Sequence, residues 1–93
     1  MKIRPHEREV RGAWREVGGK IEADENCKRI EELTQRHLHE VARDSSGWVV
    51  LYQDPSDGRY WELTYVDGGA HGGGPPKLAN LSEEEVREKY GSV

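Results

Sequence analysis

Four histidines and one cysteine are the side chains of this 93-residue sequence most suited to metal binding or nucleophilic catalysis. A zinc site needs three or four ligands that converge on one ion. Cys27 and His37 are ten residues apart, which is about 15 Å along a helix. They are therefore too far apart to share an ion or to act as a nucleophile and its base. We expect no metal site and no cofactor, and we interpret Cys27 as a small buried apolar residue.

The acidic run Glu83-Glu84-Glu85 offers neighbouring carboxylates, which general acid–base catalysis can use. Acidic residues at a helix start also interact favourably with the helix dipole and need no catalytic role. Ser82, just before them, is better suited to capping that helix than to acting as a nucleophile. A chain of this size can barely enclose a substrate pocket. We therefore expect a protein that is not an enzyme and has no catalytic residues.

The glycine run Gly72-Gly73-Gly74 could in principle surround a phosphate with its amide groups. The following Pro75-Pro76 lacks the amide donors that a phosphate would need, and no Lys-Ser or Lys-Thr pair follows. The pattern favours a loop that packs closely against backbone. A partner-binding loop is the alternative.

Aromatic and acidic side chains around the second half of the chain form the remaining candidate site. Aromatic residues among carboxylates suit a basic protein partner. In the alternative interpretation, this face is simply covered in part by the last helix and otherwise meets solvent. The predicted partner-binding residues are Asp54, Asp57, Tyr60, Glu62, Asp67 and His71.

Charge is unevenly distributed along the chain. Residues 1–20 hold six basic and three acidic residues, a net of +3, whereas residues 21–93 hold eight and fifteen, a net of −7. An acidic body favours basic partners and disfavours nucleic acid and anionic membrane surfaces. Mild acidity that serves only solubility is the alternative explanation.

The elements that must position these residues follow from local patterns. Residues 1–11 are expected to be a charged flexible arm, and residues 12–93 a single domain. Gly18-Gly19 between Trp14–Val17 and Ile21 predicts a short hairpin with a two-residue turn. Asp24 is the expected cap of one long helix, whose apolar stripe runs through Val41 and ends at Asp44–Gly47.

A second hairpin is predicted by Trp48–Gln53 and Arg59–Val66, which flank the turn Asp54-Pro55-Ser56-Asp57-Gly58. The long helix should cover its more apolar face. The expected cross-strand pairs on that face are Tyr52 with Trp61, Val50 with Leu63, and Trp48 with Tyr65.

The C-terminal helix is predicted by a capping box between Ser82 and Glu85, with Leu81 packing on Val86 and Gly91 ending the helix. We therefore expect an α+β fold in the order ββαββα. A small antiparallel sheet of two hairpins would pack on one long helix, and a short C-terminal helix would follow.

Two strings together resemble the immunity protein 27 family of bacterial polymorphic toxin systems: Gly58-Arg59-Tyr60-Trp61-Glu62-Leu63 and His71-Gly72-Gly73-Gly74-Pro75-Pro76. The resemblance runs from about Trp14 to Tyr90. It departs from the family pattern at Gly18-Gly19, where Asp-Gly is usual, and at Val66, where Pro is usual. The resemblance implies an α+β protein, encoded beside a toxin, that blocks this toxin in the producing cell. It implies no catalytic residues.

Together these observations predict an immunity protein that masks a cognate toxin domain, which we expect to be basic, as nuclease domains often are. The alternative is a small adaptor that binds an endogenous basic protein or peptide along a free sheet edge. We expect a monomer or weak dimer, with no nucleic-acid or membrane partner. Met1–Val10 is charged, and the longest uncharged apolar stretch, Gly47–Tyr52, has six residues. A cytoplasmic protein is therefore expected.

Overall fold

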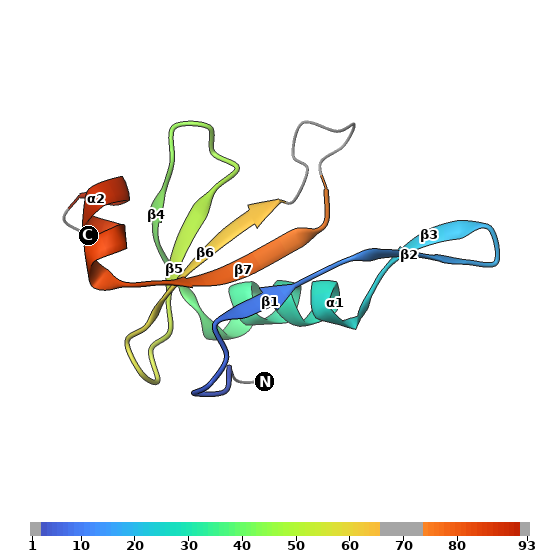
Figure 1. Ribbon diagram of the computed structural model, residues 1–93, viewed down its shortest axis with the longest axis horizontal. Helices are drawn as coiled ribbons and strands as arrows, with labels where there is room; N and C mark the ends of the chain where they lie inside the picture. Colours follow the sequence, from blue (N-terminus) through green and yellow to red (C-terminus); the bar gives the residue numbers. More distant parts are fainter. Residues whose placement is uncertain (1–2, 66–73, 92–93) are drawn as a thin grey trace.

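The computed structural model describes residues 3–65 and 74–91 (Figure 1). The secondary-structure elements in that part of the chain are, in order, β1 (Glu9–Arg11), β2 (Trp14–Val17), β3 (Lys20–Ala23), α1 (Glu25–Glu32), the π-helical turn η1 (Leu33–His37), β4 (His39–Arg43), β5 (Val50–Gln53), β6 (Tyr60–Tyr65), β7 (Pro76–Leu81) and α2 (Glu83–Tyr90).

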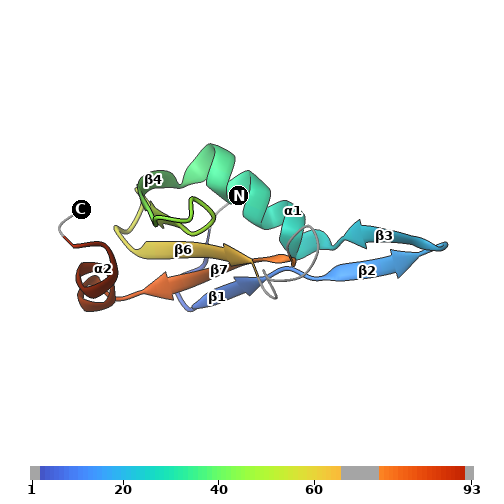
Figure 2. The same cartoon turned by 90° about the horizontal axis from the view of Figure 1, so that it is seen from above.

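The strands form two separate antiparallel sheets. Five of them pair in the order β1-β7-β6-β5-β4, while within the described residues β2 and β3 pair only with each other. Figures 1 and 2 show the β2–β3 hairpin extending away from the larger sheet. The α+β class and the C-terminal helix are confirmed. The prediction that both hairpins belong to one sheet is wrong, and the order ββαββα omits β1, β4 and β7.

The predicted long helix is wrong in its second half. It begins as expected, because the Asp24 carboxylate accepts a hydrogen bond from the Cys27 amide at 2.9 Å. After Glu32 it loosens into η1, where Thr34 Oγ1 donates to the Ile30 carbonyl at 2.9 Å and competes with the helical ladder. Residues His39–Arg43 then pair with β5 as a strand. The backbone pairing with β5 outweighs the helical spacing of the apolar residues.

Strand β7 was not predicted, although it is an interior strand of the larger sheet. It pairs with β1 on one side and with β6 on the other, and Leu78 is completely buried. Pro76 is its first residue, a position where proline is tolerated. The glycines and prolines that precede this strand obscured it in the sequence, and one of its two neighbours, β1, is distant in sequence.

The segment expected to be a flexible arm takes part in the fold. Ile3 and Val10 are buried, and β1 forms one edge of the sheet. Glu7 accepts two hydrogen bonds from the Arg29 guanidinium, at 2.6 and 2.7 Å. The Arg29 hydrogen bonds lower the pKa of Glu7 to about 2. The charges of this segment are thus used to attach it to α1.

The second hairpin has the predicted register, with Tyr52 opposite Trp61 and Val50 opposite Leu63. α1 lies along one face of the sheet (Figure 2). The core on that face contains the completely buried Trp61 and Leu33. The helix therefore lies on the face of this hairpin that carries Trp61, while Trp48 at the end of the predicted face is left exposed.

Candidate partner-binding surface

Asp54, the first predicted site residue, is completely buried and stabilises a turn. Its Oδ1 accepts hydrogen bonds from Ser56, at 2.8 Å from the amide and 2.6 Å from the hydroxyl. His37 Nε2 lies 3.0 Å from the same oxygen, although the two atoms are not aligned as a hydrogen bond. Burial alone would raise the pKa of the Asp54 carboxyl, but the Ser56 hydrogen bonds and His37 hold that pKa below its ordinary value. A partner cannot reach this side chain directly.

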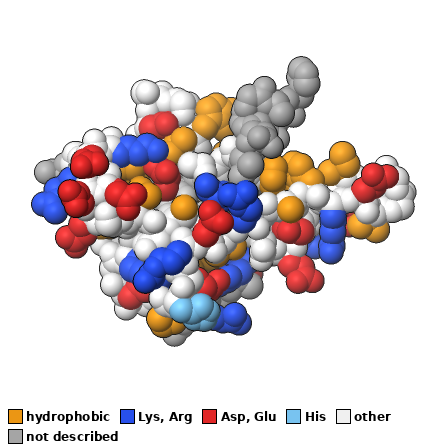
Figure 3. Space-filling model, in the orientation of Figure 1, with side chains coloured by type: hydrophobic (Ala, Val, Ile, Leu, Met, Phe, Trp, Pro, Cys, Tyr) orange, Lys and Arg blue, Asp and Glu red, His pale blue; other side chains and the backbone are white. Residues whose placement is uncertain are grey.

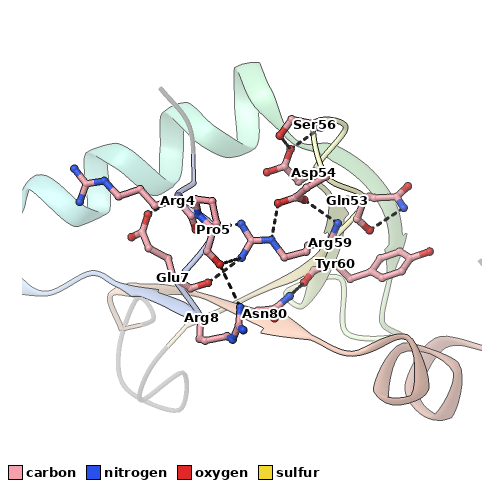
Figure 4. A network of polar contacts seen from close by, with 12 residues as sticks. Arg4, Pro5, Glu7, Arg8, Gln53, Asp54, Ser56, Arg59, Tyr60 and Asn80 are labelled. Carbon is pink, nitrogen blue, oxygen red and sulfur yellow. Dashed lines mark hydrogen bonds and ion pairs between the residues drawn. The ribbon is translucent and has the colours of Figure 1, made fainter.

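Asp57 is exposed and forms an ion pair with Arg59, with 2.6 Å between Oδ2 and Nε. The Arg59 guanidinium points toward the N-terminal segment (Figure 4). It donates to the Glu7 carbonyl at 2.9 Å and lies 5.0 Å from the centre of the Trp61 ring. Both Asp57 oxygens accept from Arg59, because the Arg59 amide also donates to Oδ1 at 3.0 Å. Asp57 therefore orients the arginine that holds residues 4–7 against the sheet, and its side chain stays partly exposed.

Glu62 is only 8% exposed and links β6 to the last helix. Its Oε2 accepts a hydrogen bond from the Tyr90 hydroxyl at 2.6 Å and lies 2.7 Å from Lys89 Nζ. Burial, and then the hydrogen bond to Glu62, raise the pKa of Tyr90 well above its ordinary value. The helix is positioned for these contacts by the predicted capping box, in which Ser82 Oγ accepts from the Glu85 amide at 3.1 Å.

An open hollow of about 370 Å³ lies between this glutamate and α2. Tyr60, which is half-buried, is paired with the hollow residue Leu81 across β6 and β7. Figure 3 shows acidic side chains gathered over α2 at this end of the molecule. The lining residues are Glu62, Leu81, Glu85, Glu88 and Lys89. Three carboxylates and one ammonium group therefore make the hollow acidic. We refer to it below as the α2 hollow.

The predicted residues thus fall into distinct environments. Tyr60 and Glu62 lie beside the α2 hollow, Asp57 lies on the turn, and Asp54 is buried beneath that turn. The predicted residues Asp67 and His71 lie outside the described part of the chain. Glu85, Glu88 and Lys89 were not predicted as site residues, and the acidic run that contains Glu85 was interpreted as the start of a helix. The high density of charged residues in this segment was the sequence signal that could have indicated them.

A second, more apolar hollow of about 460 Å³ lies between α1 and the end of the sheet. It is lined by aromatic and aliphatic side chains that include Trp14, Tyr52, Leu63 and Tyr65.

Trp48 contacts Tyr65 edge to face, with 6.2 Å between ring centres, as the predicted pairing required. It nevertheless remains 71% exposed, so α1 does not cover it.

Within the described residues, no cluster of three or more His, Cys, Asp or Glu side chains could hold a metal ion. The described helices are also too short or too polar to cross a membrane.

These features define a small α+β domain with an acidic hollow at one end. Residues 16–82 match the family described as Immunity protein 27, and the chain belongs to this family. The match covers β3 to β7 and excludes β1 and α2. Comparisons with curated proteins and with solved structures found no match.

Proposed function

We propose that this chain is an immunity protein that binds a cognate bacterial toxin and neutralises it by stoichiometric masking. The family match over residues 16–82 is the observation that carries this proposal. The protein acts in the cytoplasm of the cell that makes the toxin. It performs no chemistry on the toxin, and inhibition arises because the bound protein covers the toxin's active surface.

The α2 hollow is the proposed contact surface, and the proposed partner is a basic toxin domain. The support is electrostatic, since the hollow places Glu62, Glu85 and Glu88 around one concave region in a body whose net charge from residue 21 onward is −7. Tyr60 supplies an aromatic contact beside the hollow, and Asp57 is a proposed contact on the β5–β6 turn. Asp54 supports this surface indirectly by holding the turn, and Asp67 and His71 remain predicted contacts.

The hollow is rigid enough to bind without large rearrangement. The Tyr90 hydroxyl and Lys89 ammonium fix the Glu62 carboxylate, and the capping box fixes the first turn of α2. Preformed surfaces lose less conformational entropy on binding. Exposed carboxylates at such a rim act mainly on the association rate, and salt screens them over about 8 to 10 Å.

The test is co-expression with the toxin encoded by the neighbouring gene. The wild-type protein should restore growth, whereas a Glu88→Lys variant should protect less and associate more slowly, with the larger loss at low salt. Glu85 is left unchanged because its carboxylate accepts from the Ser82 amide in the capping box. The matched control is Glu32→Lys, which makes the same charge change on α1. Equal protection by both variants would exclude the α2 hollow as the contact surface. If the wild-type protein neither binds nor protects, the immunity proposal fails and the adaptor alternative replaces it.

A further inference from the structure

The β2–β3 hairpin is almost entirely exposed to solvent in the described structure. It contains only two strands and extends away from the larger sheet (Figures 1 and 2). Ile21 is 76% exposed, and Trp14 and Val17 are each 48% exposed. Figure 3 shows hydrophobic side chains on this projecting part of the surface. A two-stranded hairpin alone in water is marginally stable at best. Its composition therefore suits a surface that another chain covers.

The two edges of the larger sheet are each obstructed, whereas no residue in the described part of the chain obstructs the hairpin edges. At the β1 edge, the Asn26 side chain donates a hydrogen bond to the Arg11 carbonyl at 3.1 Å. At the β4 edge, the pairing shifts between Glu40 and Ala42, which leaves Val41 in an irregular position. Side-chain blocking and bulges both discourage edge-to-edge pairing. Strand addition is therefore more favourable at the hairpin.

We propose that a second copy of this chain pairs with the free edge of β3, antiparallel, with the two-fold axis at Ile21. The register follows from the turn. Gly18 and Gly19 have φ of 58° and 81° and form a two-residue loop closed by Val17 and Lys20. The backbone groups of this closing pair face each other across the turn. By alternation, the N–H and C=O of Ile21 face outward, where Ile21 of the second copy can exchange both hydrogen bonds with them.

The charges of β3 are complementary in this register. Lys20 of one copy lies opposite Glu22 of the other, and the symmetry produces this pair twice. Within each hairpin, Glu22 already lies opposite Arg15. The joined sheet therefore has a ladder of alternating charge on one face, while the two exposed Ile21 side chains meet on the other. Opposite charges and apolar neighbours are both favourable cross-strand pairs.

The outer edge of β2 does not offer the same complementarity. Glu16 lies opposite Ile21 within the hairpin, so its backbone groups also face outward. Two-fold pairing centred there would place Glu16 directly opposite Glu16 of the second copy, and like charges opposite each other are destabilising. The proposed dimer contact is therefore at the outer edge of β3 and not at that of β2. It produces a four-stranded sheet, which has the strand number that a stable sheet requires.

The proposal goes beyond toxin inhibition and is tested without any toxin. Sedimentation velocity over a concentration series should show a wild-type monomer–dimer equilibrium. Glu22→Lys and Lys20→Glu should each weaken the dimer by at least roughly tenfold, because each creates two like-charge pairs. An equal mixture of the two variants should form a heterodimer, because every Lys then lies opposite a Glu. Rescue by mixing depends on the register and would not follow from damage to the fold.

A cross-linking experiment tests the position of the two-fold axis. Directly opposite residues in a hydrogen-bonded antiparallel pair have Cα atoms about 5.5 Å apart, within disulfide reach. Ile21→Cys should therefore form a disulfide-linked dimer on mild oxidation. Glu16→Cys, on the other edge of the same hairpin, is the matched control and should not, while the buried Cys27 is common to both variants. A wild-type protein that remains monomeric at every concentration, failure of the mixture to dimerise, or equal cross-linking of both variants would overturn the proposal.

Discussion

At the scale of single residues, several charged side chains of this protein are structural. Glu7 and Arg29 attach the N-terminal segment to α1, Asp54 holds a turn, and Glu62 anchors the last helix. Each of these carboxylates has at least one closely placed donor. The acidic composition therefore contains both internal contacts and surface charge, and only the surface charge is available to a partner.

The Glu7–Arg29 pair makes stability depend on pH in the acid range. The folded-state pKa of Glu7 is about 2, against an ordinary value of 4.5. A lowered folded-state pKa gives stability that is fully present above 4.5 and is lost as pH falls toward 2. Glu7→Gln should lower the free energy of unfolding by up to about 3 kcal/mol near neutral pH, and this difference should shrink on acidification.

Urea unfolding of wild type and Glu7→Gln between neutral pH and pH 2 measures this difference. The control compares the double variant Glu7→Gln/Arg29→Gln with the single variant Arg29→Gln. These two should have nearly the same free energy of unfolding, because Glu7 has lost its partner in both. A pH-independent difference between the single variant and the wild type would contradict the assignment.

Trp61 and Glu62 are neighbours in sequence but face opposite sides of the sheet. Trp61 is completely buried against α1, so Trp61→Ala should destabilise the protein by about 3 to 5 kcal/mol. Glu62→Ala would leave the Tyr90 hydroxyl without its acceptor and should cost about 1 to 3 kcal/mol. Thermal melts of the two variants give the ranking. A larger loss for Glu62→Ala would show that the face assignment is reversed.

At the scale of elements, local signals were predictable and distant pairings were not. The Asp24 cap, the Ser82 capping box and the register of β5 with β6 all depend on residues close in sequence. Strand β7 depends on partners on both sides, and β1 on a partner about 70 residues away. Of the candidate site, Tyr60 and Glu62 were placed on the correct sheet face. The position of α2 beside them could not be inferred from its own sequence.

The capping box gives a prediction for α2. Ser82→Ala removes the acceptor of the Glu85 amide and should lower the free energy of unfolding by about 1 kcal/mol. It should also weaken toxin binding slightly, because Glu85 belongs to the α2 hollow. Chemical denaturation of the two proteins measures the stability change. An unchanged midpoint would mean that Ser82 does not support the helix.

At the scale of the whole molecule, the two proposed interaction surfaces lie at opposite ends. The protein is 46 Å long, with α2 near one end and the β2–β3 hairpin at the other (Figure 1). A toxin on the α2 hollow would therefore leave the β3 edge free, and a dimer could bind two toxins. This arrangement predicts one toxin per chain, whatever the state of association.

Titration of the purified toxin domain with this protein, followed by toxin activity, tests stoichiometric masking most directly. The activity should fall linearly, reach its minimum at one chain per toxin, and return when the complex is separated under denaturing conditions and the toxin is refolded alone. Loss of activity at a small fraction of an equivalent, without recovery, would instead indicate catalytic inactivation. Undiminished activity at several equivalents would contradict the proposed function itself.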